Sequence, residues 1–153
     1  MKPIQTGSGL TLIRVDEGII LIQPLAQILT SVSGPIWTLP EGNWWMVNTV
    51  NVQWSLAGNL APVDLFLIAN LGNQSHWTVG PAGVVTPTAF NGSVTAGRGM
   101  SNIMGPTQNL INLTLPEMLL PGGSTVSLLS SFAGFAGSWS FPVLTAFSPR
   151  PRS

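Results

Sequence analysis

Prolines and glycines interrupt the whole chain, and their spacing limits what it can fold into. The 153 residues include 13 Pro and 17 Gly, and few stretches free of both exceed a dozen residues. Proline breaks a helix interior and glycine weakens it, whereas a strand needs only about five residues. Short segments rich in β-branched and aromatic residues alternate with turn clusters, so the sequence predicts a single-domain, all-β antiparallel sandwich of about eight strands.

The longest expected strand, Asn43–Leu56, has the most informative pattern. From Thr49 onward it alternates strictly between polar and apolar residues, which gives a strand with one apolar and one polar face. The polar face has only amide and hydroxyl side chains: Thr49, Asn51, Gln53 and Ser55. Water-facing strands ordinarily include Lys as protection against edge pairing. We therefore expect this face to make a permanent contact with a partner, because neutral groups are desolvated at lower cost than charges.

The other expected strands follow from local patterns. Leu10–Val15 and Ile19–Leu25 predict a hairpin around Asp-Glu-Gly, although a helix at Pro24–Leu29 is an alternative. We expect Val63–Ala69 to be buried on both faces and to pair with Asn43–Leu56, and Asn91-Gly92 to form a type I′ hairpin turn. The last strands are predicted at Asn109–Leu115, Ser124–Phe132 and Ser138–Phe147.

The final predicted strand and two turns contain further detail. Trp139, Phe141, Val143 and Phe147 are expected to share one face, and Pro142 predicts an edge strand or a bulge because proline cannot donate to a ladder. The turns LPEG (Leu39–Gly42) and LPGG (Leu120–Gly123) each precede a strand, which indicates similar turn chemistry at both places.

Charge is scarce and balanced. The chain has 5 Lys+Arg and 5 Asp+Glu, so its formal net charge is zero, and charged residues make up 7% against about 25% in a typical soluble domain. Such a chain has little electrostatic protection against association, which predicts a homo-oligomer.

With no cysteine, disulfides and thiolate metal sites are excluded. The N-terminus lacks a signal-like apolar run, and the most apolar window, residues 19–32, is too short to span a membrane, so we expect a soluble, non-secreted protein.

The inventory of reactive side chains argues against an enzyme, and we expect no cofactor. His76 is the only histidine, and general acid–base catalysis usually needs a partnered titratable group. Four carboxylates fall in predicted turns, and Asp64, inside an apolar run, has Arg98 as a possible structural partner. A calcium site built from loop carbonyls stays open. One arginine between Gly42 and Pro149 is too little basic charge for nucleic-acid binding.

The ends and the tryptophans supply the candidate contact residues. Residues 1–9 are predicted to form an arm, 10–147 the domain, and 148–153 a Pro/Arg tail, with both ends packing on neighbouring chains. Trp54 and Trp139 are expected in the core, whereas the consecutive Trp44 and Trp45 should point to opposite sides. The candidate partner-interface residues are Trp44, Trp45, Asn51, Gln53, Arg150 and Arg152. Exposed tryptophans beside amides would also suit a carbohydrate-binding or adhesin-type module.

One stretch of the chain resembles a known class of proteins. The turn LPEG followed by NWWMVNTVNVQWSLAG and VDLFLIANLG, and later LPGGSTVSLLSSFAG before SWSFPVLTAF, is similar to the small jelly-roll proteins that decorate or cement the capsids of tailed bacteriophages. The resemblance covers about residues 36–147. It implies a non-enzymatic, often trimeric virion protein that is made in the host cytoplasm and binds the major capsid protein at the capsid surface. A tail or fibre subunit is the alternative of the same kind.

Overall fold

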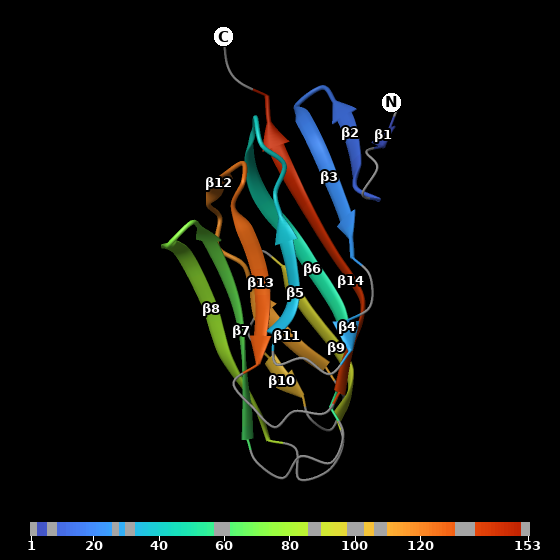
Figure 1. Cartoon of the computed structure of the whole chain (residues 1–153), viewed down its shortest axis with the longest axis vertical. Helices are drawn as coiled ribbons and strands as arrows, with labels where there is room; N and C mark the ends of the chain where they lie inside the picture. Colours follow the sequence, from blue (N-terminus) through green and yellow to red (C-terminus); the bar gives the residue numbers. More distant parts are fainter. Residues whose placement is uncertain are drawn as a thin grey trace.

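The computed structural model describes residues 3–5, 9–25, 28–29, 33–56, 62–85, 90–97, 103–105, 110–130 and 137–150. These residues form strands and turns, and they contain no helix, so the alternative helix at Pro24–Leu29 is wrong for the described residues there. Two sheets pack face to face as a sandwich (Figure 1). No described segment is a helix long and apolar enough to cross a membrane. The predicted all-β sandwich is confirmed.

The larger sheet has ten strands and the smaller sheet four. The larger sheet contains β1 (Pro3–Gln5), β2 (Thr11–Val15), β3 (Gly18–Pro24), β4 (Ile28–Leu29), β6 (Trp44–Leu56), β9 (Phe90–Gly97), β10 (Ile103–Gly105), β11 (Leu110–Thr114), β12 (Leu119–Pro121) and β14 (Gly137–Pro149). The smaller sheet contains β5 (Ser33–Thr38), β7 (Pro62–Leu71), β8 (Gln74–Val85) and β13 (Thr125–Ser130).

The strand order identifies the architecture. Within the larger sheet the central strands run β3-β14-β6-β9, and the smaller sheet runs β5-β13-β7-β8. Two four-stranded sheets wound in this order form a jelly roll, in which consecutive strands often belong to opposite sheets. These eight strands match the predicted number. The remaining strands extend the larger sheet, and β1 and β2 lie at its right-hand edge, beyond the smaller sheet (Figure 1).

The core between the sheets is built around tryptophans. Trp54 of β6 and Trp139 of β14 face each other across the strand pair, with ring centroids 5.1 Å apart and planes within 9°. Both are fully buried, as predicted, and so are Trp37 and Trp45. Val50 and Val52 of β6 are buried alongside Trp54, which confirms the apolar face of that strand.

The two Leu-Pro-x-Gly turns lie against each other at one end of the sandwich. The Leu39 amide donates to the Ser124 carbonyl (2.8 Å), and the Gly123 amide donates back to the Leu39 carbonyl (2.9 Å). Each turn ends on a glycine with positive φ, +95° at Gly42 and +88° at Gly123, a conformation that other residues adopt at a cost. Main-chain hydrogen bonds therefore join two turns that are far apart in the sequence.

Three of the predicted local features are wrong. Asn91 and Gly92 lie inside β9, paired with Ser55 and Trp54, rather than in a hairpin turn. β7 pairs with β13 and β8, not with β6, because the jelly roll sends these consecutive strands to different sheets. Val63–Ala69 is not fully buried on both faces, since Phe66 and Ile68 are only half-buried.

The two ends of the described chain pack on their own sheet. Residues Pro3–Gln5 pair with β2 as β1, and β14 continues to Pro149, which lies opposite Gly18. The Arg150 amide donates to the Glu17 carbonyl (2.7 Å). The prediction that the ends pack on neighbouring chains is thus wrong for residues 3–5 and 148–150, since a proline at the last position of a strand need not donate to the ladder.

Candidate interaction surface

The outward-pointing residues of the larger sheet form one continuous face without charge in the described part of the chain. Residues that alternate with buried neighbours along β3, β14, β6, β9 and β11, and their partners on β2, are brought into register by strand pairing. We call this surface the outer face; its members are Thr11, Ile13, Ile20, Ile22, Phe141, Val143, Thr145, Phe147, Trp44, Met46, Thr49, Asn51, Gln53, Ser93, Thr95, Asn112, Thr114 and Leu119. Asn51 and Gln53 are exposed there, as predicted.

The part of the outer face near the start of β6 is apolar. Pairing places Ile13, Ile20, Phe147, Met46 and Leu119 side by side across β2, β3, β14, β6 and β12. Leu119 is 39% exposed, and Trp44, the first residue of β6 and opposite Pro121, is 57% exposed. We call these six residues the apolar band. An exposed tryptophan within such a row is typical of a surface that contacts a partner.

Apart from the apolar Ile22, Val143 and Phe141, the rest of the outer face is polar. It contains Thr145 of β14, Thr49, Asn51 and Gln53 of β6, Ser93 and Thr95 of β9, and Asn112 and Thr114 of β11, and we call this set the polar half. The hydroxyls of Thr49 and Thr145 share a hydrogen bond (2.5 Å), which ties the two central strands together on this side.

A strained aromatic residue stands within the polar half. The pairing of β14 with β6 shifts after Ser140, so that Phe141 and Pro142 oppose the single residue Val52. This is a β-bulge, as Pro142 predicted, although β14 is a central strand and not an edge strand. Phe141 has φ +52° and its side chain is 75% exposed. Beside it lies a hollow of about 190 Å³, lined by Phe141 with Asn51, Val52, Gln53, Ser93, Val94 and Thr95.

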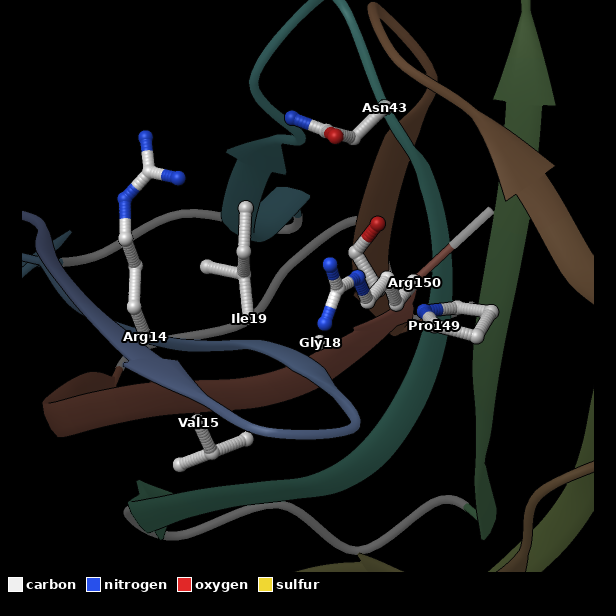
Figure 2. Close-up of a pocket in the computed structure, with 8 residues that line it drawn as sticks. Arg14, Val15, Gly18, Ile19, Asn43, Pro149 and Arg150 are labelled. Atoms are coloured by element: carbon white, nitrogen blue, oxygen red, sulfur yellow. The ribbon is translucent and has the colours of Figure 1, made fainter. Parts of the chain in front are cut away.

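A second hollow, of about 380 Å³, lies at the end where the β2–β3 turn meets the end of β14. Figure 2 shows Arg14 and Arg150 on either side of Ile19, with Asn43 above them. Among the described residues no carboxylate lines this hollow, although Asp16 and Glu17 stand in the adjoining turn. Two guanidinium groups and an amide around an apolar floor can hold a carboxylate or another anion of a partner.

The ionisable groups available for catalysis among the described residues are spread over four places: the turn with Asp16 and Glu17, the turn with Glu41, the segment with Glu117, and β8 with His76. His76 is the extra residue of a bulge in β8, half-buried, and its Nε2 has no hydrogen-bond partner among the described residues. Asp16, Glu17 and Glu41 are exposed in turns, and Glu117 is exposed between β11 and β12. In the described ranges no three His, Cys, Asp or Glu residues are grouped to hold a metal ion. The side chains of Asp64 and Arg98 lie outside the described residues.

The structure brings some of the predicted interface residues together and separates others. Asn51 and Gln53 lie in the polar half, Trp44 in the apolar band, and Arg150 at the second hollow. The prediction that Trp45 is an interface residue is wrong. Its side chain is fully buried and its Nε1 donates to the Pro40 carbonyl (2.8 Å), so it belongs to the core. Arg152 lies outside the described residues.

Sequence reasoning missed Phe141 as a surface residue. It was expected to share one face with Trp139, Val143 and Phe147, and this is wrong for Trp139: the bulge inserts one residue into β14, so Trp139 points inward while the other three point outward. Trp139 is therefore buried, whereas Phe141 is exposed. The available signal was Pro142, which predicted the bulge but not its effect on the preceding ring.

The outer side of the smaller sheet has isoleucine and threonine side chains among the residues whose exposure the structure describes. Ile36 and Ile68 face outward there, opposite Ser127 of β13, and Ile36 is 53% exposed. Thr38 and Thr78 are exposed on the same side.

Comparison with known proteins identifies no relative: no family model, no curated protein and no solved structure matches the chain.

Proposed function

We propose that this protein is a non-enzymatic structural subunit of a virion, a capsid decoration protein that binds the major capsid protein and stabilises the shell. The observation that supports this proposal most directly is the uncharged outer face, which spans six strands of the larger sheet. A protein free in solution ordinarily covers such an area with mixed charges.

The chemistry of the outer face suits a contact that forms once and persists. Burying a charged group in an interface costs several kcal/mol unless it is well paired, whereas a buried neutral amide or hydroxyl costs about 1–3 kcal/mol even when unpaired. The polar half has only neutral groups, each able to hydrogen-bond with a partner. Its dehydration is therefore inexpensive compared with that of an ordinary charged surface.

The apolar band supplies the driving force for attachment to the capsid protein. A tryptophan side chain contributes up to about 250 Å² of contact surface, so covering the exposed 57% of Trp44 removes about 140 Å² from water. At about 25 cal/mol per Å², this burial contributes at most about 3.5 kcal/mol. Trp44 alone can thus change the affinity by at most about 300-fold.

The end with Arg14 and Arg150 is the second attachment point in this proposal. Both side chains are exposed beside the hollow of about 380 Å³, where they can reach a carboxylate of the capsid protein. An ion pair at such an exposed position contributes about 1 kcal/mol or less and weakens as salt is added. In this proposal the ion pair contributes more to the orientation of the bound subunit than to its affinity.

Two measurements test the proposal. An antiserum raised against the recombinant protein should label purified virions over the capsid surface, whereas label confined to the tail would identify a tail or fibre subunit. Absence of the protein from purified virions would contradict a structural role altogether.

Rebinding to stripped particles tests the surface. Trp44→Ala should weaken rebinding by about 10- to 100-fold, because the largest exposed ring of the apolar band is lost. Ile36→Ala is the matched control, since Ile36 is similarly exposed on the opposite sheet. Equal losses for both variants would show that the outer face has no special role.

A carbohydrate-binding or adhesin-type module is the second candidate. Trp44 and Phe141 are exposed aromatic rings, and Phe141 has amides and hydroxyls beside it, a combination that can stack on and hydrogen-bond a neutral sugar. Titration with neutral mono- and disaccharides, followed by nuclear magnetic resonance, separates the two candidates. Shifts confined to these rings would favour the sugar-binding function.

A further inference from the structure

We infer that two copies of this chain associate through their polar halves about a two-fold axis, with Phe141 of each copy seated in the hollow of the other. The inference rests on the proposed function, in that it names one partner of a subunit built for assembly. It assigns a role to the most unusual residue of the outer face.

Phe141 has a conformation that folding alone does not require. Its φ of +52° lies in the left-handed region, which side chains other than glycine occupy at a cost, and its ring stays 75% exposed. The bulge opposite Val52 holds it there, in the middle of the larger sheet. Bulges often re-aim a side chain at a functional site, and here the bulge leaves an aromatic ring exposed on an otherwise polar surface.

The hollow beside Phe141 has the size of an aromatic ring. Its volume is about 190 Å³, and a cavity of about 150 Å³ is enough to hold a benzene molecule. Asn51, Gln53, Ser93 and Thr95 surround it with polar groups, and the Phe141 ring supplies its apolar wall, because the side chains of Val52 and Val94 are buried on the opposite side of the sheet. Because Phe141 lines the hollow as well, a ring entering from a second copy would lie next to it, as aromatic pairs prefer.

The placement of ring and hollow selects the symmetry. Both belong to one face and adjoin each other, so a copy turned by a half rotation presents its ring to the hollow and its hollow to the ring. This reciprocity defines an isologous contact. A head-to-tail ring of copies would instead need the ring and the hollow on different faces of the molecule.

The chemistry of the polar half favours an identical partner. In a two-fold contact, residues near the axis meet their own kind, so charged residues there would repel one another. Amide side chains such as those of Asn51 and Gln53 both donate and accept hydrogen bonds, and hydroxyls such as that of Thr95 do too. Each of these residues can therefore form a hydrogen bond with the same residue of a second copy.

The available area is sufficient for a modest interface. A footprint over the five strands β3 to β11, along Thr49–Ser55, measures about 24 by 23 Å, from a strand spacing of about 4.8 Å and a rise of about 3.3 Å per residue. Two such faces bury about 1,100 Å² in total, just above the roughly 1,000 Å² expected of a biological interface. We expect a dissociation constant on the order of 10 µM, with the apolar band left outside the footprint.

Sedimentation of the full-length protein over a range from about 1 to 200 µM is the first test. The wild type should pass from monomer to dimer, or to an even-numbered assembly if a threefold contact also forms. Phe141→Ala should weaken the association at least tenfold while leaving the fold intact, as judged by circular dichroism. Thr38→Lys, on the outer side of the smaller sheet, is the control that should leave association unchanged.

A pair of variants with opposite charges at position 53 distinguishes a lost interface from a folding defect, because a misfolded variant would not recover association when the two are mixed. Gln53→Lys and Gln53→Glu should each sediment as monomers, because like charges meet across the axis, whereas their mixture should recover the dimer. Four results would overturn the inference: a wild type that stays monomeric at about 200 µM, an odd-numbered assembly only, a dimer unaffected by Phe141→Ala, or no recovery in the mixture. If the protein is monomeric but antiserum still detects it on virions, the dimer inference is wrong and the proposed function remains. If the protein is a dimer but is absent from virions, the proposed function is wrong and the dimer inference remains.

Discussion

The left-handed backbone at Phe141 predicts an inversion of the usual order of stability between two substitutions. Alanine at this position keeps the unfavourable φ of +52°, whereas glycine adopts that angle freely. Both substitutions remove the same exposed ring, so any contribution of the ring to packing or association cancels in their comparison. The difference in stability between the two variants therefore reports the conformational energy of the backbone at position 141.

The magnitude follows from two opposing contributions. A residue other than glycine pays about 1–2 kcal/mol in the left-handed region, and Phe141→Gly relieves this strain. Glycine in a strand loses about 0.5–1 kcal/mol relative to alanine, because the unfolded chain gains freedom. The difference leaves Phe141→Gly more stable than Phe141→Ala by about 0.5–1 kcal/mol, a rise in thermal midpoint of about 1–4 °C for a chain of this length.

Urea denaturation followed by tryptophan fluorescence measures this difference directly, since Trp54 and Trp139 are buried beside the bulge. Gln53 provides the matched control: it is exposed on the neighbouring strand and is not among the positive-φ residues. Gln53→Ala should be more stable than Gln53→Gly, in the ordinary order. If alanine were also the more stable substitution at position 141, the backbone there would not be strained and the argument for a re-aimed ring would fail.

Three further predictions concern the core, the C-terminal end and the lone histidine. Gly34→Ala should lower the free energy of unfolding by about 1–3 kcal/mol, because the added Cβ would lie 2.7 Å from the Leu128 carbonyl oxygen and 3.0 Å from two Trp139 atoms; an unchanged urea midpoint would contradict this packing. Deleting residues 148–153 should destabilise the protein by about 1–3 kcal/mol through lost pairing with β3 and the lost Arg150–Glu17 hydrogen bond, whereas deleting 151–153 should leave the thermal midpoint nearly unchanged. His76→Ala should change stability by less than about 1 kcal/mol and leave rebinding to particles intact, and a loss of any activity would revive an enzymatic interpretation.

The features that local sequence predicted are those that depend on neighbouring residues. The alternation along β6 fixes which side chains are buried, and the adjacency of Trp44 and Trp45 places one on each side. The near absence of charge is likewise visible without a structure. The sandwich and the uncharged face of β6 could thus be predicted.

The features that local sequence missed depend on distant pairing. Asn91-Gly92 favours a turn in isolation, but pairing with Ser55 and Trp54 extends the strand through it. The partner of β6 is β14, whose register shift at Phe141 no short pattern specifies. For the same reason the hollow beside Phe141, which needs β6, β9 and β14 together, could not be predicted from any one segment.

The position of β14 has a consequence for how this protein is made. It is the last described strand in the sequence, yet it lies between β3 and β6 in the middle of the larger sheet. Until a ribosome has released residues 137–149, the chain has two unpaired strand edges and lacks Trp139, half of its tryptophan stack. Synthesis from the N-terminus therefore gives no stable partial sandwich, and a prematurely terminated chain presents open edges that favour aggregation. Synthesis of β14 therefore acts as a checkpoint, because only a chain that includes this strand forms the continuous outer face.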